Sequence, residues 1–298
     1  MAIKLSGFAD EAGPTLAEQI RAHQELGWDT IEVRMVGEGA SATNFTEIDD
    51  ATYAKCKAEL AAAKMGICCF GSPLANWARK ITNPFEQDVE SLRRSIPRMR
   101  ELGTKYIRVM SYPNDGLSKA DWLKEAVRRL KELSRMAEGG GVVLVHENCS
   151  GYGGESPEML GEVLAAVDSP AFKVAFDTGN PVAHTGENKD CVEGRTWEFY
   201  RVSKARTVHV HIKDAKPGAD GKIAFCFPGE GAGEVRRVVK DLVASGYSGY
   251  MTIEPHIAKV VHLGQTGGRP LSGYEKYIEY GRRMKAILDE AQKAGAGK

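Results

Sequence analysis

Two histidines and a lysine alternate along a short apolar segment near residue 210. In "TVHVHIKDA", residues 207–215, successive side chains of a β-strand would point to opposite faces, so His209, His211 and Lys213 share one face. The valines and the isoleucine between them share the other face and indicate a buried strand. A lone buried histidine is more often a hydrogen-bonded core residue than a ligand, so this segment alone leaves both interpretations open.

Three further apolar runs end in a carboxylate. The segments "VHENCSG", "AFDTGNP" and "TIEPH" place Glu147, Asp177 and Glu254 at the ends of expected strands. Taken singly, such a residue is typical of a turn, a helix cap or the surface. With His211 they form a set of three carboxylates and one imidazole, which is costly to gather unless a cation joins it. The set predicts a divalent metal site that suits Mn²⁺ or Mg²⁺ best, with Co²⁺ or Zn²⁺ as alternatives.

The strands that would position these residues recur eight times. Short runs rich in β-branched residues alternate with longer segments in which apolar residues recur every three or four positions. We expect strands at residues 3–8, 30–34, 66–70, 106–110, 142–147, 173–177, 207–212 and 250–254. A left-handed glycine would end several of the helical segments between them, at Gly27, Gly66, Gly103, Gly139 and Gly246.

Regular alternation of strands and helices predicts an α/β fold with a parallel sheet, and eight units favour a (β/α)₈ TIM barrel. The chain has 298 residues, 42% of them hydrophobic, and no linker-like stretch, so we expect a single domain over residues 1–298. The glycines lack the GxGxxG order of a dinucleotide site. The carboxyl ends of barrel strands meet at one mouth, where the long connections 71–85, 178–195, 213–232 and 255–272 would also lie.

Overall composition narrows the possible partners. Lysine plus arginine equals aspartate plus glutamate at 40 each, which gives no electrostatic reason to expect nucleic acid. No apolar run approaches the ~18–20 residues that span a membrane. The first residues lack the pattern of a secretory signal, so cytoplasmic residence is the expectation. The six cysteines form no CxxC pair and are expected to be free thiols.

Several motifs are specific enough to resemble a known family. The glutamate of the fifth strand, the "FDTGN" and "HxHxKDA" boxes, the "PGEG" turn at 228–231 and the "IEP" ending resemble the sugar phosphate isomerase/epimerase family of xylose-isomerase-like TIM barrels. The resemblance covers essentially the whole chain. Its members include ketose 3-epimerases, hydroxypyruvate isomerase and inosose dehydratase, with endonuclease IV-type nucleases as remote relatives.

The resemblance implies roles for individual residues. The metal ligands fall on Glu147, Asp177, His211 and Glu254, and the two glutamates would also act as acid/base groups on opposite faces of the substrate. We expect His209 and Asp214 to support these groups from a second layer. Candidate substrate contacts on the same rim of the barrel mouth are His146, Asn180, Lys213, Glu230, His256 and Trp77. The loop after the first strand would complete this rim with Phe8, Asp10 and Glu11.

Two positions depart from the pattern of the ketose epimerases. Asn180 stands where those enzymes carry a substrate-binding histidine, and Pro217 stands where they carry an arginine. An assignment as a free-ketose 3-epimerase is therefore not implied. The metal site is unaffected by either change.

The expected function is a divalent-metal-dependent isomerase or epimerase of a sugar, keto-sugar or polyol, acting by proton abstraction through an enediolate. A lyase or dehydratase on a keto-sugar, inosose or 3-keto-glycoside shares the first proton abstraction and stays an alternative. An endonuclease is less favoured, because residues 214–231 contain no Asp-x-His pair. A non-catalytic sugar-binding module is a third possibility. The expected partner is a small carbohydrate, and relatives in the family suggest a homo-oligomer.

Overall fold

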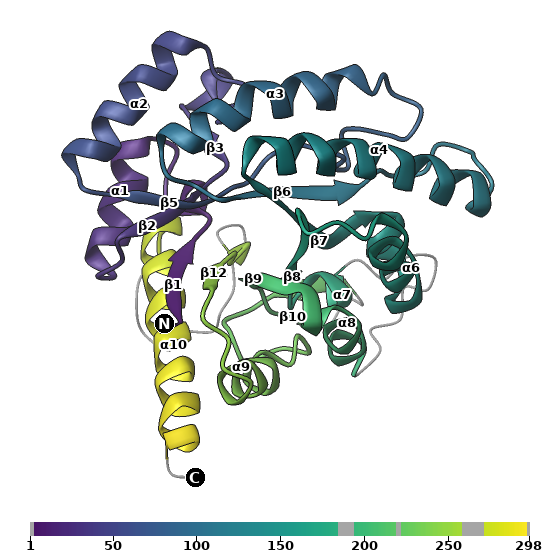
Figure 1. Ribbon diagram of the computed structural model, residues 1–298. Coiled ribbons are helices and arrows are strands. Elements are labelled where there is room, and N and C mark those ends of the chain that lie inside the picture. Colours follow the sequence, from purple (N-terminus) through teal and green to yellow (C-terminus); the bar gives the residue numbers. More distant parts are fainter. Residues whose placement is uncertain (1–2, 184–193, 219–221, 258–270, 297–298) are drawn as a thin grey trace.

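Eight parallel strands form a nearly closed barrel in the computed structural model, which describes residues 3–183, 194–218, 222–257 and 271–296 (Figure 1). Around the barrel the order is β1, β12, β9, β8, β7, β6, β5, β2. This confirms the predicted TIM barrel. The strands are β1 Lys4–Gly7, β2 Thr30–Val33, β5 Gly66–Phe70, β6 Tyr106–Ser111, β7 Val143–Gly151, β8 Phe172–Asp177, β9 Thr207–Ile212 and β12 Tyr250–Ile253.

The seam between β1 and β2 is joined differently from the others. Seven neighbouring pairs form parallel ladders, whereas Phe8 and Glu32 form an isolated bridge at this seam. The hydroxyl of Ser6 also donates to the carbonyl of Thr30 at 2.8 Å. The barrel is therefore closed here by a few contacts near its inner wall.

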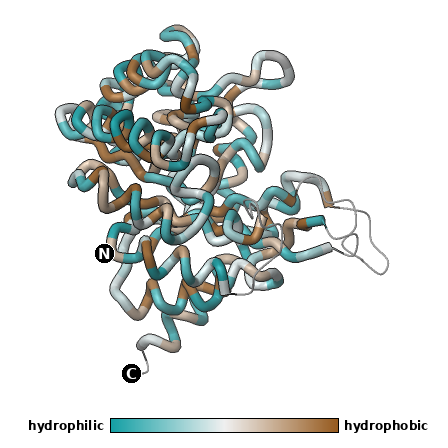
Figure 2. The backbone as a smooth tube through the Cα atoms, turned by 90° about the vertical axis from the view of Figure 1, so that its right-hand side faces the viewer, coloured by the Kyte–Doolittle hydropathy of each residue, from teal (hydrophilic) through white to brown (hydrophobic). Residues whose placement is uncertain are grey.

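Helices surround the barrel, and their alternating apolar and polar segments are visible along the tube in Figure 2. Local sequence explains where several of these helices begin, because a side-chain oxygen accepts a hydrogen bond from an otherwise unpaired backbone N–H of the first turn. Thr15 caps the first helix in this way and forms a capping box with Glu18. The covering helices are α1 Leu16–Glu25, α2 Asp50–Ala62, α3 Glu86–Glu101, α4 Lys119–Gly140, α6 Pro157–Val167, α8 Arg195–Ser203, α9 Val235–Ala244 and α10 Gly273–Ala296.

Two of the expected glycine caps are wrong. Helix α4 continues through Gly139, and Gly141 takes the left-handed conformation with φ 73°. Gly66 begins β5, and the left-handed residue before it is Lys64 with φ 52°. Gly27, Gly103 and Gly246 do have positive φ, as predicted. In both cases a residue with positive φ lies within two positions of the predicted glycine.

Short elements add to the loops that follow the strands. A hairpin after β2 joins β3 Met35–Val36 to β4 Thr43–Asn44, and one after β9 joins β10 Ala215–Pro217 to β11 Ile223–Phe225. Three-residue helices and single turns make up the rest: η1 Ala9–Glu11, η2 Gly39–Ser41, α5 Tyr152–Glu155, α7 Asn180–Ala183 and η3 Lys204–Arg206. Parts of the expected connections 178–195, 213–232 and 255–272 lie outside the described residues.

The two faces of the barrel strands differ in polarity. Outward-facing side chains such as Leu144, Phe176 and Ile212 are fully buried in the main hydrophobic core against the helices. The inner wall instead carries buried polar groups on several strands, among them Ser6, Glu32, Arg108, His209 and Thr252. The polar face of "TVHVHIKDA" thus lies inside the barrel, where alternation along the strand places it.

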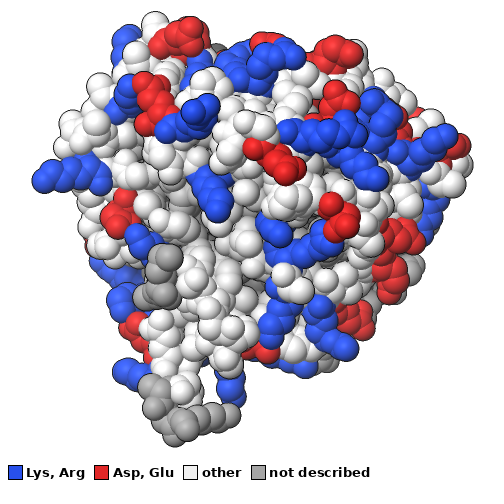
Figure 3. Space-filling view, in the orientation of Figure 1, with Lys and Arg blue, Asp and Glu red and all other residues white. Residues whose placement is uncertain are grey.

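The surface is charged and mixed in sign. On the face shown in Figure 3, acidic and basic side chains are interspersed. None of the helices in the described part of the chain has the length and apolar character needed to cross a membrane. Five cysteines are free thiols, as expected, and Cys191 lies outside the described residues.

Candidate metal centre

The four predicted metal ligands converge at the mouth of the barrel. Glu147, Asp177 and His211 come from β7, β8 and β9, and Glu254 directly follows β12. One ligand atom from each residue lies within 4.8 Å of all the others. All four side chains are buried, with at most 3% exposure. Residues spread over more than a hundred positions therefore form one compact group.

Carboxylate oxygens in this group remain available to a cation. Oε2 of Glu147, Oδ2 of Asp177 and Oε2 of Glu254 are buried without a hydrogen-bond partner. Lys213 Nζ lies 2.8 Å from Oε2 of Glu254 and 3.3 Å from Oδ2 of Asp177. Its hydrogen bond in this group goes instead to Oδ1 of Asn180, at 2.9 Å. Arg108 lies 3.2 Å from Oε2 of Glu147, so each of the three oxygens is near a positive charge but accepts no hydrogen bond, which leaves its lone pairs to a cation.

Neighbouring groups hold the ligands in place. Oδ1 of Asp177 accepts the backbone N–H groups of Gly179 and Asn180 at 2.8 and 2.6 Å, which leaves Oδ2 for the site. Asn148 ties the ends of β7 and β8 together, because its side chain both donates to and accepts from the backbone of Asp177. Such second-layer contacts orient a ligand before an ion arrives.

His211 is held between two carboxylates. Its Nδ1 lies 3.1 Å from Glu147 Oε1, and its Nε2 lies 3.2 Å from Glu32 Oε1. The ring of Phe8 contacts it edge-on at a centroid distance of 4.9 Å. Burial opposes a positive charge on His211, but Glu32 and Glu147 outweigh burial and raise its pKa to about 10.

Each of the two candidate acid/base glutamates has its own arginine. Arg108 on β6 lies 3.2 Å from Glu147, and Arg34 lies 2.9 Å from Glu254. Burial works against ionisation of Glu147, but Arg108 and His211 outweigh it and lower its pKa to about 2. Burial likewise opposes ionisation of Glu254. The positive charge of Lys213 has the largest opposite effect, His256 and Arg34 add to it, and together they hold the pKa of Glu254 well below its usual range. Both groups are therefore carboxylates at neutral pH.

Asp177 behaves differently from the two glutamates. Burial raises its pKa to about 6, even though Lys213 opposes the shift, and the negative charges of Glu254 and Glu147 add to it. A bound cation would favour the ionised form, since opposite charge nearby stabilises a carboxylate.

The charges of the site and its surroundings fit a divalent ion. Among the described residues, six connected carboxylates face three permanently charged bases, namely Asp10, Glu11, Glu32, Glu147, Asp177 and Glu254 against Arg34, Arg108 and Lys213. Oxygen ligands with one imidazole suit Mg²⁺ or Mn²⁺. When the protonated imidazole of His211 is counted as a further positive charge, the carboxylates still outnumber the cations. The donor set and the oxygens that accept no hydrogen bond also agree with the predicted cofactor.

Three of the predicted substrate contacts lie at the site or its rim. Asn180 donates to Glu147 Oε1 at 3.2 Å and accepts from Lys213. His256 bonds to Glu11 through Nδ1 at 2.6 Å and places Nε2 3.5 Å from Glu254. Its side chain is about one-third exposed, which places it where the buried group meets solvent.

Three other candidates are not brought into the buried group. His146 points away from Glu147, is fully buried, and packs against Phe172 at 5.7 Å between ring centroids. Adjacent strand residues face opposite ways, so Glu147 and His146 cannot both face the barrel interior. Glu230 pairs with Arg283 on α10, and Trp77 is 69% exposed on the loop after β5.

The two predicted supporting residues take different positions. His209 lies on the inner wall of β9 below His211, with 5.2 Å between ring centroids. Asp214 accepts the backbone N–H groups of Ala215, Gly229, Gly231 and Gly233, so it anchors the loop after β9. His209 therefore lies below the ligands, and Asp214 lies behind the rim.

Sequence reasoning did not single out Arg34, Arg108 or Glu32. The signal was available for Arg108, which alternates with apolar residues in "YIRVM" as the histidines do in β9. Arg34 also contacts Asp10 and Glu11, at 3.0 and 3.3 Å. Its partners are fixed by which strands become neighbours, and no local pattern carries that information.

Comparisons with known proteins agree with this geometry. A family model described as xylose isomerase-like TIM barrel matches residues 20–284. An inosose dehydratase of Clostridium botulinum is 27% identical over 139 residues, which cover 42% of this chain and 44% of that protein. The similarity therefore spans less than half the length of this relative.

Solved structures show the same fold over almost the whole chain. A xylose isomerase-like TIM barrel protein from Mycobacterium smegmatis, solved in complex with magnesium, has a TM-score of 0.70 at 18% identity and covers 98% of this chain and 97% of its own. A D-tagatose 3-epimerase-like protein gives a TM-score of 0.70 at 18% identity, with 99% of both chains covered. With the family match over residues 20–284, these findings show that the chain belongs to the xylose isomerase-like TIM barrel family.

Proposed function

We propose that this protein is a divalent-metal-dependent enzyme of carbohydrate metabolism that isomerises or epimerises a small sugar, keto-sugar or polyol. One observation carries the proposal: Glu147, Asp177, His211 and Glu254 converge at the barrel mouth, and three of their buried oxygens accept no hydrogen bond. These four residues would hold the ion, with Mg²⁺ or Mn²⁺ preferred. The magnesium named for the Mycobacterium smegmatis structure supports this choice.

When bound, a divalent ion stabilises negative charge on adjacent substrate oxygens and so makes the neighbouring C–H more acidic. The proton is then taken by a residue of this chain. Glu147 and Glu254 are the candidates, since Arg108 beside the first and Lys213 beside the second keep both carboxylates ionised and therefore able to accept a proton. The glutamate that takes the proton becomes a carboxylic acid and can return that proton to the neighbouring carbon of the enediolate, which gives an isomer. If the two glutamates stand on opposite faces of the substrate, an epimer forms when the second glutamate first takes up a proton from solvent and then delivers it to the other face.

Lys213 and Asn180 complete the proposed site. Lys213 Nζ is within 3.3 Å of carboxylates of both Asp177 and Glu254, and Asn180 lies between Lys213 and Glu147. Hydrogen-bond donors at these positions would bind substrate hydroxyl groups and fix the orientation of the carbon chain. The buried surroundings limit access of water to the reacting carbon.

A lyase reaction is the second candidate, and the similarity to an inosose dehydratase favours it. The same proton abstraction would be followed by loss of a hydroxyl group from the next carbon. The ammonium of Lys213 is 2.8 Å from Glu254, where it would protonate the departing hydroxyl. The two outcomes differ only after the enediolate has formed.

The test is NMR of ketoses, inososes and 3-keto-glycosides incubated with the protein in D₂O and Mn²⁺, with removal of the paramagnetic ion before spectra are recorded. Deuterium at a carbon together with a new isomer or epimer supports the first proposal. Loss of water or of the aglycone supports the lyase instead. Metal binding without exchange in any substrate contradicts both and favours a binding module, and cleavage of abasic DNA would indicate a nuclease.

Glu147→Gln and Glu254→Gln test whether each glutamate transfers a proton. Each change keeps the shape of the side chain but removes its ability to accept a proton, so turnover should fall by at least about 10³-fold, combining loss of the base with weaker metal binding. Glu290→Gln, at a surface pair with Arg236, is the control and should retain full activity. Turnover within about tenfold of wild type in either site variant would remove that residue from the mechanism.

A further inference from the structure

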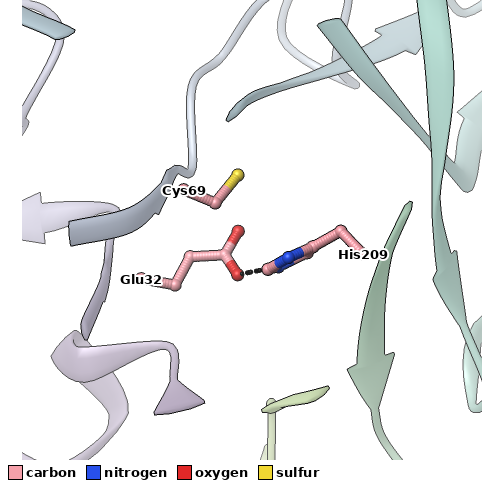
Figure 4. A group of neighbouring side chains, drawn as sticks. All are labelled: Glu32, Cys69 and His209. Carbon is pink, nitrogen blue, oxygen red and sulfur yellow. Dashed lines mark hydrogen bonds and ion pairs between the residues drawn. The ribbon is translucent and has the colours of Figure 1, made fainter. Parts of the chain in front are cut away.

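A carboxylate lies between the two histidines of β9, below the proposed metal centre. Glu32 Oε2 lies 2.6 Å from Nε2 of His209, and Glu32 Oε1 lies 3.2 Å from Nε2 of His211. All three side chains are completely buried. Figure 4 shows Glu32 reaching from β2 toward His209, with Cys69 of β5 beside it. One carboxylate thus bonds to two imidazoles through separate oxygens.

The backbone around this carboxylate is irregular in a way that positions it. The pairing of β2 with β5 shifts register between Ile31 and Glu32, and the pairing of β8 with β9 shifts at Val174 and Ala175, beside His209. Such irregularities redirect the side chain next to them. Glu32 also forms the isolated bridge with Phe8 across the seam between β1 and β2. The inward direction of Glu32 is therefore fixed from both neighbouring strands.

We propose that Glu32 is a positioning residue that accepts the Nε2–H of His211 and so presents the Nδ1 lone pair of that ring to the metal ion. The inference rests on the proposed metal-dependent function. An imidazole ligand must offer one nitrogen without a proton, and the partner of the other nitrogen decides which one that is. The partner atoms support this assignment, since Nδ1 of His211 faces Glu147 within the ligand group.

His209 completes the arrangement. Its Nε2–H donates to the second oxygen of Glu32, and this contact keeps the carboxylate from rotating away from His211. Thr252 Oγ1 lies 3.2 Å from the same nitrogen. Glu32, Cys69 and His209 lie close enough to resemble a second ion site. An ion held there by Nε2 of His209 would break the 2.6 Å contact between this nitrogen and Glu32, so the group is better explained as support for His211.

Glutamine at position 32 tests the role, because it keeps the size of the side chain but has one acceptor oxygen for two N–H groups. Glu32→Gln should lower the affinity for Mn²⁺, measured by titration calorimetry, by about 10- to 100-fold. Thr252→Val is the matched control, since it removes a hydroxyl group beside His209 Nε2 and leaves both contacts of Glu32 with the histidines in place, and it should bind Mn²⁺ as the wild type does. Circular dichroism would establish that both variants fold.

A second measurement needs no variant and determines which nitrogen of His211 carries the proton. In ¹⁵N spectra of the Mg²⁺-loaded wild type, His211 should carry its proton on Nε2, with a strongly downfield proton resonance. A proton on Nδ1 would overturn the inference. Equal Mn²⁺ affinity in Glu32→Gln and wild type would also overturn it while leaving the proposed function intact. No binding of Mn²⁺ or Mg²⁺ by the wild type would overturn both.

Discussion

Lys213 supplies the positive charge nearest to two of the proposed metal ligands. Its ammonium contacts Asp177 and Glu254 inside a fully buried group. A buried carboxylate that loses its counter-charge destabilises the folded state strongly, since the remaining charge has neither water nor a partner. The stability of this protein should therefore depend on both Lys213 and the ion.

Lys213→Met should lower the free energy of unfolding in EDTA by about 3 kcal/mol. In saturating Mn²⁺ the loss should be much smaller, because the ion supplies positive charge to the same oxygens. Urea denaturation with and without Mn²⁺ measures both values. Lys285→Met, which removes a surface pair with Asp289, should have little effect in either condition. Equal losses with and without the ion would contradict this account.

At the scale of elements, the loop after β9 depends on a single carboxylate. Asp214 accepts four backbone N–H groups, three of them from glycines between residues 229 and 233. The glycines are required because the chain passes close to the strand end. A Cβ at Gly231 would lie 2.4 Å from the carbonyl oxygen of Ala215. Asp214 therefore holds the "PGEG" turn against β9.

Asp214→Asn should release this loop. Asparagine keeps one acceptor oxygen, and its NH₂ group would face backbone donors, so about 2 kcal/mol of unfolding free energy should be lost. Limited proteolysis should show faster cleavage between residues 218 and 233, and urea denaturation should give the stability. Asp289→Asn, on the exposed surface, is the control. Identical cleavage rates in Asp214→Asn and wild type would show that the loop is held by other contacts.

The strands themselves were predictable from the sequence, because each combines β-branched residues with the period of two that a barrel wall imposes. The convergence of Glu147, Asp177, His211 and Glu254 followed from their position at the ends of those strands. The contacts of Arg34 and Glu32 did not follow, since they depend on register shifts and on which strands become neighbours. The outward position of His146 could have been predicted, because it precedes Glu147 on one strand and adjacent strand residues face opposite ways.

At the scale of the whole molecule, the first strand and the first helix pack against the last helix beside the barrel. Helix α10 lies beside β1 in Figure 1, and the hydroxyl of Tyr277 on α10 lies 3.2 Å from Nε2 of His23 on α1. His23 Nδ1 lies 2.8 Å from the carbonyl oxygen of Gln19, to which it donates as a neutral ring. A Cβ at Gly7 would overlap the tyrosine hydroxyl at 1.8 Å, so β1 approaches α10 closely here.

This contact should make stability depend on pH. Burial lowers the pKa of His23 to about 4, whereas the unfolded chain has a value near 6.5. The unfolded state therefore binds the proton first as pH falls, and stability is lost between about pH 6.5 and pH 4. The contribution of this one group is on the order of 3 kcal/mol at the acid end.

Urea denaturation of wild type and His23→Gln between pH 8 and pH 4 measures this contribution. Glutamine retains a donor and an acceptor but does not titrate, so its unfolding free energy should fall less steeply below pH 6.5. The difference between the two curves isolates His23 from the other acid-titrating groups. Parallel curves would show that His23 takes up its proton without opposing the fold.

The pairing of β1 with β12 also bears on when the proposed metal centre is completed during synthesis of the chain. Lys4 is aligned with Tyr250, and Arg34 reaches Glu254 across 220 positions of sequence. Contacts of such separation form only when both partners are available to the folding chain. On a ribosome, the ligand group would lack Glu254 until almost the entire barrel had been translated. A truncated or stalled product would then carry most of the strands but an incomplete centre.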